Sequence, residues 1–205
     1  MSDNKKDSTV KTLVILLNMG GPQNKDEIHP YLKELFQDRE LLKLPFQKLL
    51  GRFIAWRRTP KIQERYEEIG QYSPTKKIME EQNKEISKKL DEKSPETAPH
   101  LCVSGFRYCS PRTGEMIEKY KTAEKIVLFS QYPQHSCSTS GSSLCDAYRW
   151  LNGQKDQNLR NKISVIDQWW DRDDYSELWA MLIQRKFEEM KTSHDLNDED
   201  IRIIY

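Results

Sequence analysis

Thr12–Asn18 reads TLVILLN, a continuous apolar run that leads into Gly20-Gly21-Pro22. An apolar run of strand length that ends at turn-forming residues predicts a strand buried on both faces, as the strands of parallel sheets are. The rest of the chain alternates helical and strand-like patterns. This alternation predicts right-handed crossovers and an α/β fold, in which helices flank both faces of a parallel sheet.

The remaining elements are predicted from the same kind of pattern. Further strands are expected at Leu101–Arg107, Lys125–Ser130, Lys162–Ile166 and Ile201–Tyr205. Helices are expected at Asp26–Gln37, Phe46–Arg57, Lys61–Ile69, Thr75–Glu92, Arg112–Lys121, Leu144–Asn152 and Tyr175–Lys191, with a Ser/Thr/Gly loop at Ser136–Ser143. Thr59-Pro60 and Ser73-Pro74 predict two of the helix starts, because each places a capping hydroxyl before a proline at the first helical position.

The expected organisation is a flexible N-terminal segment, residues 1–11, followed by one Rossmann-like α/β lobe, residues 12–205. In a parallel sheet a buried strand normally leads to a loop and a covering helix, whereas domain boundaries fall in polar linkers. The chain stops on the strand-like residues IRIIY. We therefore expect the lobe to be truncated before a second lobe.

Composition limits the class of protein. Hydrophobic residues make up 36% and charged residues 32% of the chain, as in a soluble globular protein. The net charge is +1 and no long basic face is present, so nucleic-acid binding is not expected. The four cysteines show no CxxC spacing and are expected to be reduced intracellular thiols. The N-terminus shows neither a secretory signal nor a recognisable transit peptide.

Residues that follow the expected strands are candidates for a binding site, because ligands collect at the carboxyl ends of parallel strands. These residues are Asn18–Pro22, Gly105–Tyr108 and Gln131–Ser143. They lack the GxGxxG and Walker patterns of nucleotide loops. Arginine with tyrosine and methionine suits a large flat apolar ligand that carries carboxylates. The alternative is that they are ordinary loop residues.

The segment Leu41–Arg58, LLKLPFQKLLGRFIAWRR, combines many apolar residues with basic residues and contains no acidic residue. Two interpretations remain open. The segment contacts an anionic membrane surface or forms the apolar entrance of a ligand site, or it is a core helix with a solvated basic side.

Five blocks of sequence resemble one family in their order and spacing. They are LNMGGP (Leu17–Pro22), DRELLKLP (Asp38–Pro45), RRTPKIQERY (Arg57–Tyr66), GFRY (Gly105–Tyr108) and QYPQHSCSTSGSS (Gln131–Ser143). Together they identify the chain as similar to the N-terminal half of an animal-type ferrochelatase. The resemblance implies a chelatase-like lobe and a lyase that inserts ferrous iron into protoporphyrin IX to form protohaem, the last step of haem biosynthesis. It also implies a mitochondrial location at the matrix side of the inner membrane, peripheral membrane contact through residues 41–58, and a possible homodimer.

The resemblance also implies roles for individual residues. Arg58, Tyr66 and Ser73 match family positions that contact the porphyrin, and Met19 matches a pocket residue beside the macrocycle. Arg107 and Tyr132 match polar groups of the same cavity. Tyr66 and Ser73 also have structural interpretations, as a helix-face aromatic and as an N-cap.

Cys137 matches a single ligand of the 2Fe–2S cluster of animal ferrochelatases. Such a cluster needs four thiolates, and the remaining cysteines do not match the family's other three ligands, so we expect this chain not to hold it. Where the family has IDRWPTHH, residues 166–174 read IDQWWDRDD, which puts Arg172 or Asp173 in place of a histidine.

Porphyrin metallation requires a base that removes two pyrrole protons and an acidic relay that carries them away. By resemblance, the base is the histidine of a SAHSLP block, which this sequence does not contain. His29, His100, His135 and His194 are not assigned as catalysts. We therefore expect the chain alone to lack activity. Two alternatives remain open: a non-catalytic half that binds porphyrin or haem, and an interaction partner of a full-length ferrochelatase.

Overall fold

The computed structural model describes residues 10–70, 72–194, 197 and 200–202. Its strands are β1 (Thr12–Asn18), β2 (His100–Phe106), β3 (Lys125–Ser130) and β4 (Ile163–Ile166). Its α-helices are α1 (Lys25–Gln37), α2 (Gln47–Glu68), α3 (Thr75–Lys93), α4 (Thr113–Lys119), α5 (Ser142–Asn152), α6 (Gln157–Asn161) and α7 (Asp173–His194). A 3-10 turn, η2, covers Pro95–Thr97, and a π-helical turn, η3, covers Cys137–Gly141.

The chain divides into two units, Met1–Gln168 and Trp169–Tyr205. The first unit contains the sheet and the helices α1 to α6. The second contains α7, on which Leu178, Trp179 and Met181 are exposed. Within the described part of the chain, no helix has the length and apolar character that a membrane crossing needs.

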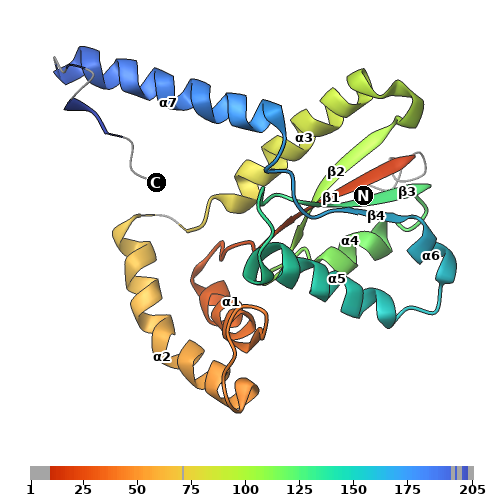
Figure 1. Cartoon of the computed structure of the whole chain (residues 1–205). Helices are drawn as coiled ribbons and strands as arrows, with labels where there is room; N and C mark the ends of the chain where they lie inside the picture. Colours follow the sequence, from red (N-terminus) through yellow and green to blue (C-terminus); the bar gives the residue numbers. More distant parts are fainter. Residues whose placement is uncertain (1–9, 71, 195–196, 198–199, 203–205) are drawn as a thin grey trace. The chain divides into compact units, whose positions relative to one another are not determined.

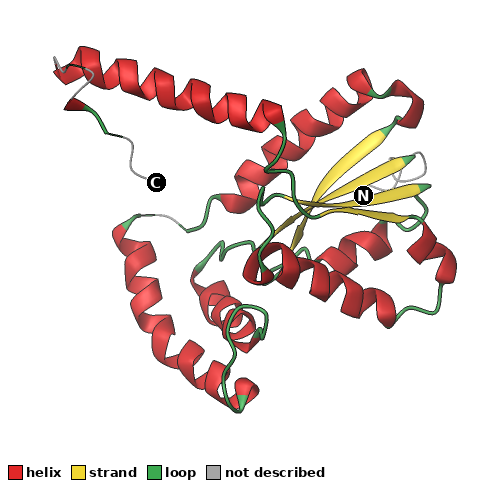
Figure 2. Ribbon diagram, in the orientation of Figure 1, coloured by secondary structure: helices red, strands yellow, loops and turns green. Residues whose placement is uncertain are grey.

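β1 is an inner strand of a four-stranded parallel sheet with the order β2-β1-β3-β4 (Figures 1 and 2). Thr12 lies opposite His100 of β2 and Lys125 of β3. The chain runs from β1 to β2 on one side and then crosses to β3 on the other. The carboxyl ends of β1 and β3 therefore flank the point where the strand order reverses, which is where ligands bind in open α/β sheets.

The two faces of β1 pack into different cores. Leu13, Ile15 and Leu17 pack with residues of α4, α5 and α6, whereas Val14 and Leu16 pack with residues of α3. Successive side chains of a strand point to opposite faces, so the TLVILLN run fills both layers. This arrangement confirms the predicted parallel sheet flanked by helices.

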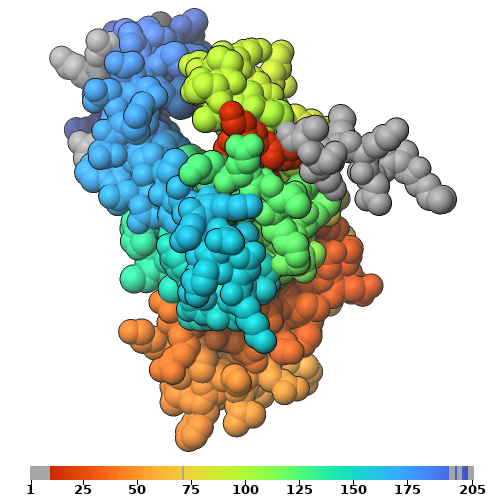
Figure 3. Space-filling model, turned by 90° about the vertical axis from the view of Figure 1, so that its right-hand side faces the viewer, coloured from red at the N-terminus to blue at the C-terminus, as the bar shows by residue number. Residues whose placement is uncertain are grey.

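Helices α1 and α2 form a third cluster of their own. Ile28 and Leu32 of α1 are buried against Ala55 of α2, with Tyr66 packed beside them. We call residues 25–68, which comprise α1, the connection 38–46 and α2, the hairpin. In the space-filling view its orange surface lies below the green-to-cyan surface of β3, α5 and α6 (Figure 3).

Two details of the predicted elements differ from the structure, and a third is not tested by it. The helices expected at Phe46–Arg57 and Lys61–Ile69 are one helix, α2, which continues through Pro60. A proline inside a helix costs ~3 kcal/mol, whereas Ile62 and Tyr66, which follow Pro60, pack against the cluster formed with α1 and favour the continuous helix. The loop expected at Ser136–Ser143 is helical, because η3 runs directly into α5. The strand expected at Ile201–Tyr205 falls largely outside the described residues.

Candidate functional site

The carboxyl ends of β1 and β3 are joined by side-chain hydrogen bonds. Asn18 Nδ2 donates to Gln131 Oε1 at 3.0 Å, and the backbone N–H of Met19 donates to the Tyr132 hydroxyl at 2.9 Å. Burial raises the pKa of Tyr132, so its hydroxyl stays neutral. Two of the predicted site residues, Met19 and Tyr132, therefore meet at the point where the strand order reverses.

The glycines that follow β1 allow close packing at this rim. Gly20 has a φ of 82°, and a Cβ there would lie 2.3 Å from Cys109 Sγ. A Cβ on Gly21 would lie 2.3 Å from Ser73 Oγ. The backbone N–H of Ser73 donates to the Pro22 carbonyl at 3.0 Å. The structure thus brings Ser73, the third predicted residue, against the loop that carries Met19.

Arg58 and Tyr66, two further predicted residues, lie on α2 of the hairpin. The rings of Tyr66 and Tyr72 stack with 5.6 Å between their centroids. Burial raises the pKa of Tyr66. Arg58 is exposed, and its guanidinium carbon lies 5.5 Å from the centroid of the Phe36 ring. None of the hydrogen bonds or ion pairs described connects either residue to Met19 or to Tyr132.

Arg107, the remaining predicted substrate residue, is buried and turned into the protein. Its guanidinium forms an ion pair with Asp38 at 3.1 Å and a longer one with Asp146 at 3.5 Å. Its Nε donates to Ser142 Oγ at 3.0 Å, and its plane lies over the Tyr108 ring at 4.9 Å. Both ion-pair partners of Arg107 are therefore carboxylates of the protein itself.

Asp38 lies at the centre of this buried network. Burial disfavours its charge, but hydrogen bonds from Ser142 and the Glu40 backbone, with the Arg107 charge, outweigh burial and hold its pKa below the ordinary value. Burial raises the pKa of the neighbouring Tyr108 to about 12, so its hydroxyl remains a donor. Sequence reasoning missed Asp38 and Ser142 as members of the site, although both fall within blocks that carry the family resemblance.

The segment 41–58 exposes most of its large apolar side chains. Phe46 is 81% exposed, Leu49 70%, Phe53 55% and Trp56 66%. The last three are separated by four and three residues, so they share one face of α2. The exposed face favours the first interpretation of the segment, although Ala55 on the same helix is buried against α1, as the second interpretation expects.

A family model described as ferrochelatase matches residues 11–204. The chain belongs to the ferrochelatase family. It is 50% identical to "Ferrochelatase, mitochondrial" of Xenopus laevis over 161 residues, which are 78% of this chain and 39% of that protein. Its identity to the protein of the same name from Homo sapiens is 49% over 161 residues, 78% of this chain and 38% of that protein.

The relative from Dictyostelium discoideum, also named "Ferrochelatase, mitochondrial", is 38% identical over 195 residues, which are 94% of this chain and 46% of that protein. The chain therefore spans less than half the length of these curated relatives. The match to the family model nevertheless covers nearly all residues of this chain.

The ferrochelatase resemblance also assigned a cluster ligand, Cys137, which is exposed at the first residue of η3. Among residues 10–70, 72–194, 197 and 200–202, no group of three or more His, Cys, Asp or Glu side chains is arranged to hold a metal ion. A 2Fe–2S cluster needs four ligands. The described residues do not fit this cluster, and we assign no chemical step to it.

No catalytic role is assigned to the three histidines whose side chains are described, and the residues at the altered family position are exposed. His135 Nδ1 lies 3.2 Å from Asp167 Oδ2 on the surface, whereas His100 is buried and pairs with Asp91 at 2.8 Å. His29 contacts Thr59, and the side chain of His194 falls outside the described residues. Arg172 and Asp173 are exposed in the second unit, where Arg172 contacts Asp174.

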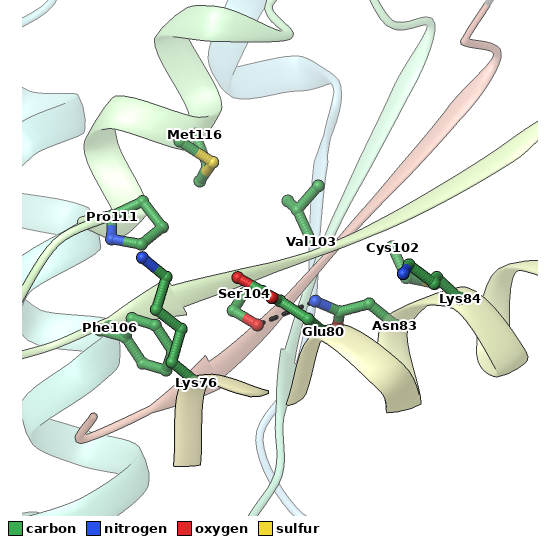
Figure 4. A pocket seen from close by; sticks show the side chains of 10 residues that line it. All are labelled: Lys76, Glu80, Asn83, Lys84, Cys102, Val103, Ser104, Phe106, Pro111 and Met116. Carbon is green, nitrogen blue, oxygen red and sulfur yellow. Dashed lines mark hydrogen bonds between the residues drawn. The ribbon is translucent and has the colours of Figure 1, made fainter. Parts of the chain in front are cut away.

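Two hollows lie near the sheet. One, of about 590 Å³, is lined by residues that include Tyr31, Lys76 and Tyr108. The other, of about 290 Å³, follows the edge of β2 between α3 and the start of α4, where Asn83 Nδ2 donates to Ser104 Oγ at 2.9 Å (Figure 4). None of the six predicted porphyrin residues lines either hollow.

Proposed function

We propose that this chain forms the porphyrin-binding N-terminal lobe of a ferrochelatase, the lyase that inserts ferrous iron into protoporphyrin IX. The observation that carries the proposal is the pairing of Met19 with Tyr132 at the carboxyl ends of β1 and β3. This is the expected ligand position in such a sheet, and it holds two residues that the ferrochelatase resemblance assigns to the porphyrin.

The proposed substrate surface has two parts. Met19, Ser73 and Tyr132 form a compact rim, in which Met19 and Tyr132 offer apolar surface to the macrocycle. Arg58 and Tyr66 are carried by the hairpin, and the exposed Arg58 is available to a propionate. A guanidinium can bind a carboxylate through two parallel hydrogen bonds.

Metallation requires two pyrrole protons to leave while the macrocycle bends so that its nitrogens point towards Fe²⁺. Binding accelerates this step only where it favours the bent ring over the flat one. In our proposal the rim and the hairpin hold opposite parts of the macrocycle and thereby restrain its shape. The base that accepts the protons belongs to the SAHSLP block of the family.

The proposal extends to location. The relatives are named mitochondrial ferrochelatases, and we propose the same compartment for this protein, at the matrix side of the inner membrane. The exposed apolar residues of segment 41–58 and its basic residues suit an anionic membrane surface. Porphyrin is an apolar substrate, and it could reach Arg58 from the membrane along the exposed surface of segment 41–58.

The test compares two neighbouring arginines. Arg58→Ala should weaken the binding of protoporphyrin to the chain roughly ten- to a hundredfold, because a charge-assisted contact contributes ~1.5–3 kcal/mol. Arg57→Ala should have little effect, since a solvated charge contributes weakly. Fluorescence titration gives both affinities.

Protoporphyrin dimethyl ester is the ligand control. It offers no carboxylate, so the wild type and Arg58→Ala should bind it equally. No porphyrin binding by the chain, or equal losses for both arginines, would contradict the proposed site.

A further inference from the structure

The hairpin is attached to the sheet mainly by polar contacts. Its apolar cluster is separate from the two cores that contain β1. From α1, the Tyr31 hydroxyl donates to the Gly20 carbonyl at 3.3 Å, and the Tyr31 ring packs edge-on against Tyr108 at 5.8 Å. Among the residues that the structure describes, three ion pairs also connect the hairpin to the body of the unit.

Two of the three ion pairs are on the surface. Glu34 of α1 lies 3.5 Å from Arg112, and Glu40 of the connection lies 3.4 Å from Arg149. The side chains of Glu34 and Arg112 are 45% and 28% exposed, and those of Arg149 and Glu40 are 58% and 33% exposed. Partly solvated pairs of this kind contribute little, so we expect the buried pair to contribute most to the position of the hairpin.

The third ion pair is buried, and both carboxylate oxygens of Asp38 accept hydrogen bonds. The side chain of Asp38, at the end of α1, is 1% exposed, and that of Arg107, next to the end of β2, is 7% exposed. Asp38 Oδ2 accepts hydrogen bonds from the Tyr108 hydroxyl at 2.9 Å and from Ser142 at the start of α5. Its Oδ1 accepts from the backbone N–H of Glu40 at 2.9 Å.

This carboxylate therefore joins three elements that are far apart in the sequence: the end of α1, the end of β2 and the start of α5. A charge held by several short contacts in a buried site has little freedom to move. Loss of the Asp38 charge would leave Asp146, 3.5 Å from Arg107, as the arginine's carboxylate partner, and would remove the buried ion pair between the hairpin and the body. The predicted porphyrin residues lie on both sides of this junction, with Arg58 and Tyr66 on the hairpin and Met19 at the rim.

We propose that Asp38 is a positioning residue, which fixes the hairpin against the rim and so sets the spacing between the two halves of the porphyrin surface. The part that concerns porphyrin rests on the proposed function. Arg107 then acts as the internal partner of Asp38 and not as a ligand of the substrate. Asp38 itself does not touch the porphyrin.

The first experiment measures amide hydrogen exchange in the chain without ligand. Asp38→Asn should raise exchange in α1 and α2 about tenfold while exchange in β1 and β3 stays unchanged. Glu40→Gln, which removes a surface pair from the same connection, is the matched control and should change neither region. Unchanged exchange in the hairpin, an equal rise throughout the sheet, or the same effect from Glu40→Gln would overturn the proposal.

A second pair of variants covers the case in which Asp38→Asn does not fold. Tyr108→Phe and Ser142→Ala each remove one donor to Asp38 and retain the ion pair. Each should raise exchange about threefold, again in the hairpin alone. If both leave the hairpin at wild-type exchange rates, the proposal fails.

The second experiment separates positioning from ligand contact. Asp38→Asn should weaken the binding of protoporphyrin and of its dimethyl ester by the same factor, about tenfold. The number of binding sites should stay unchanged. Arg58→Ala should weaken only the binding of protoporphyrin, the free acid, and not that of the ester. A lower number of sites at unchanged affinity would indicate a loss of folded protein and would count against positioning. If the wild type binds no porphyrin, the proposed function fails, whereas the exchange experiment still decides the role of Asp38.

Discussion

The sheet and the hairpin differ in the burial of their large apolar side chains. Leu13, Ile15 and Leu17 of β1 are fully buried between helical layers, whereas Phe46 and Leu49 of the hairpin are exposed to solvent. The sheet is held together by apolar packing. The hairpin has a small core of its own and is attached to the sheet through Tyr31, the Asp38 network and surface ion pairs.

In the proposed porphyrin site this difference would separate two properties. The carboxyl ends of two inner strands position Met19 and Tyr132, while the hairpin presents exposed apolar surface. Apolar residues left on a surface mark contacts with other molecules when they form a contiguous patch. Variants in the two regions should therefore have different consequences.

The largest expected effect concerns catalysis, because the ferrochelatase resemblance assigns the base to a SAHSLP block that neither region contains. The chain should insert iron into protoporphyrin no faster than the uncatalysed reaction, because the histidine of the family's SAHSLP block is not among its 205 residues. Anaerobic incubation with ferrous iron, followed by haem absorbance, measures the rate. Sustained turnover would show that the rim and the hairpin do more than bind.

The next effect concerns stability and uses one leucine from each region. Leu17→Ala should lower the free energy of unfolding by ~2–5 kcal/mol, since the side chain is fully buried and its loss leaves a cavity. Leu49→Ala, at a site that is 70% exposed, should change it by less than ~0.5 kcal/mol. Urea denaturation measures both values. Similar losses would mean that the hairpin's exposed face is part of the folding core.

The smallest effect concerns membrane binding, which only the hairpin should support. Replacing Phe46 and Leu49 with serine should weaken binding to anionic vesicles at least tenfold, because each buried apolar side chain contributes ~1.5–3 kcal/mol. Ile78→Ser is the control, since Ile78 is 48% exposed on α3, outside the hairpin. Vesicle co-sedimentation gives the affinities. An equal loss for the control would indicate non-specific adhesion.

Much of the fold could be predicted because its signals are local. The strand at Thr12–Asn18 and that at Lys125–Ser130 have the predicted bounds, since buried parallel strands are short apolar runs with turn residues around them. The continuous α2 could not be predicted. Thr59-Pro60 is a local start signal, whereas the packing that carries the helix through Pro60 involves α1.

In the candidate site, too, some residues could be predicted from the neighbouring sequence and others depend on contacts between distant segments. Met19 and Tyr132 could be proposed from their places after strands, a property of the local sequence. The burial of Arg107 could not, because its partners Asp38 and Ser142 come from the end of α1 and the start of α5. An arginine after a strand is compatible with a substrate contact and with an internal ion pair, and only the fold distinguishes them.

The contact between Gly21 and Ser73 has a consequence for how sequences of this lobe can diverge. Any side chain at position 21 would overlap the Ser73 hydroxyl, which lies 2.3 Å from the place of a Cβ. An alanine at 21 therefore requires the residue at 73 to shrink or to move, and Ser73 is tied by its backbone to Pro22. The two positions, fifty-two apart in the chain, are therefore coupled in one direction: a side chain at 21 requires a change at 73, whereas a smaller residue at 73 leaves Gly21 without a clash.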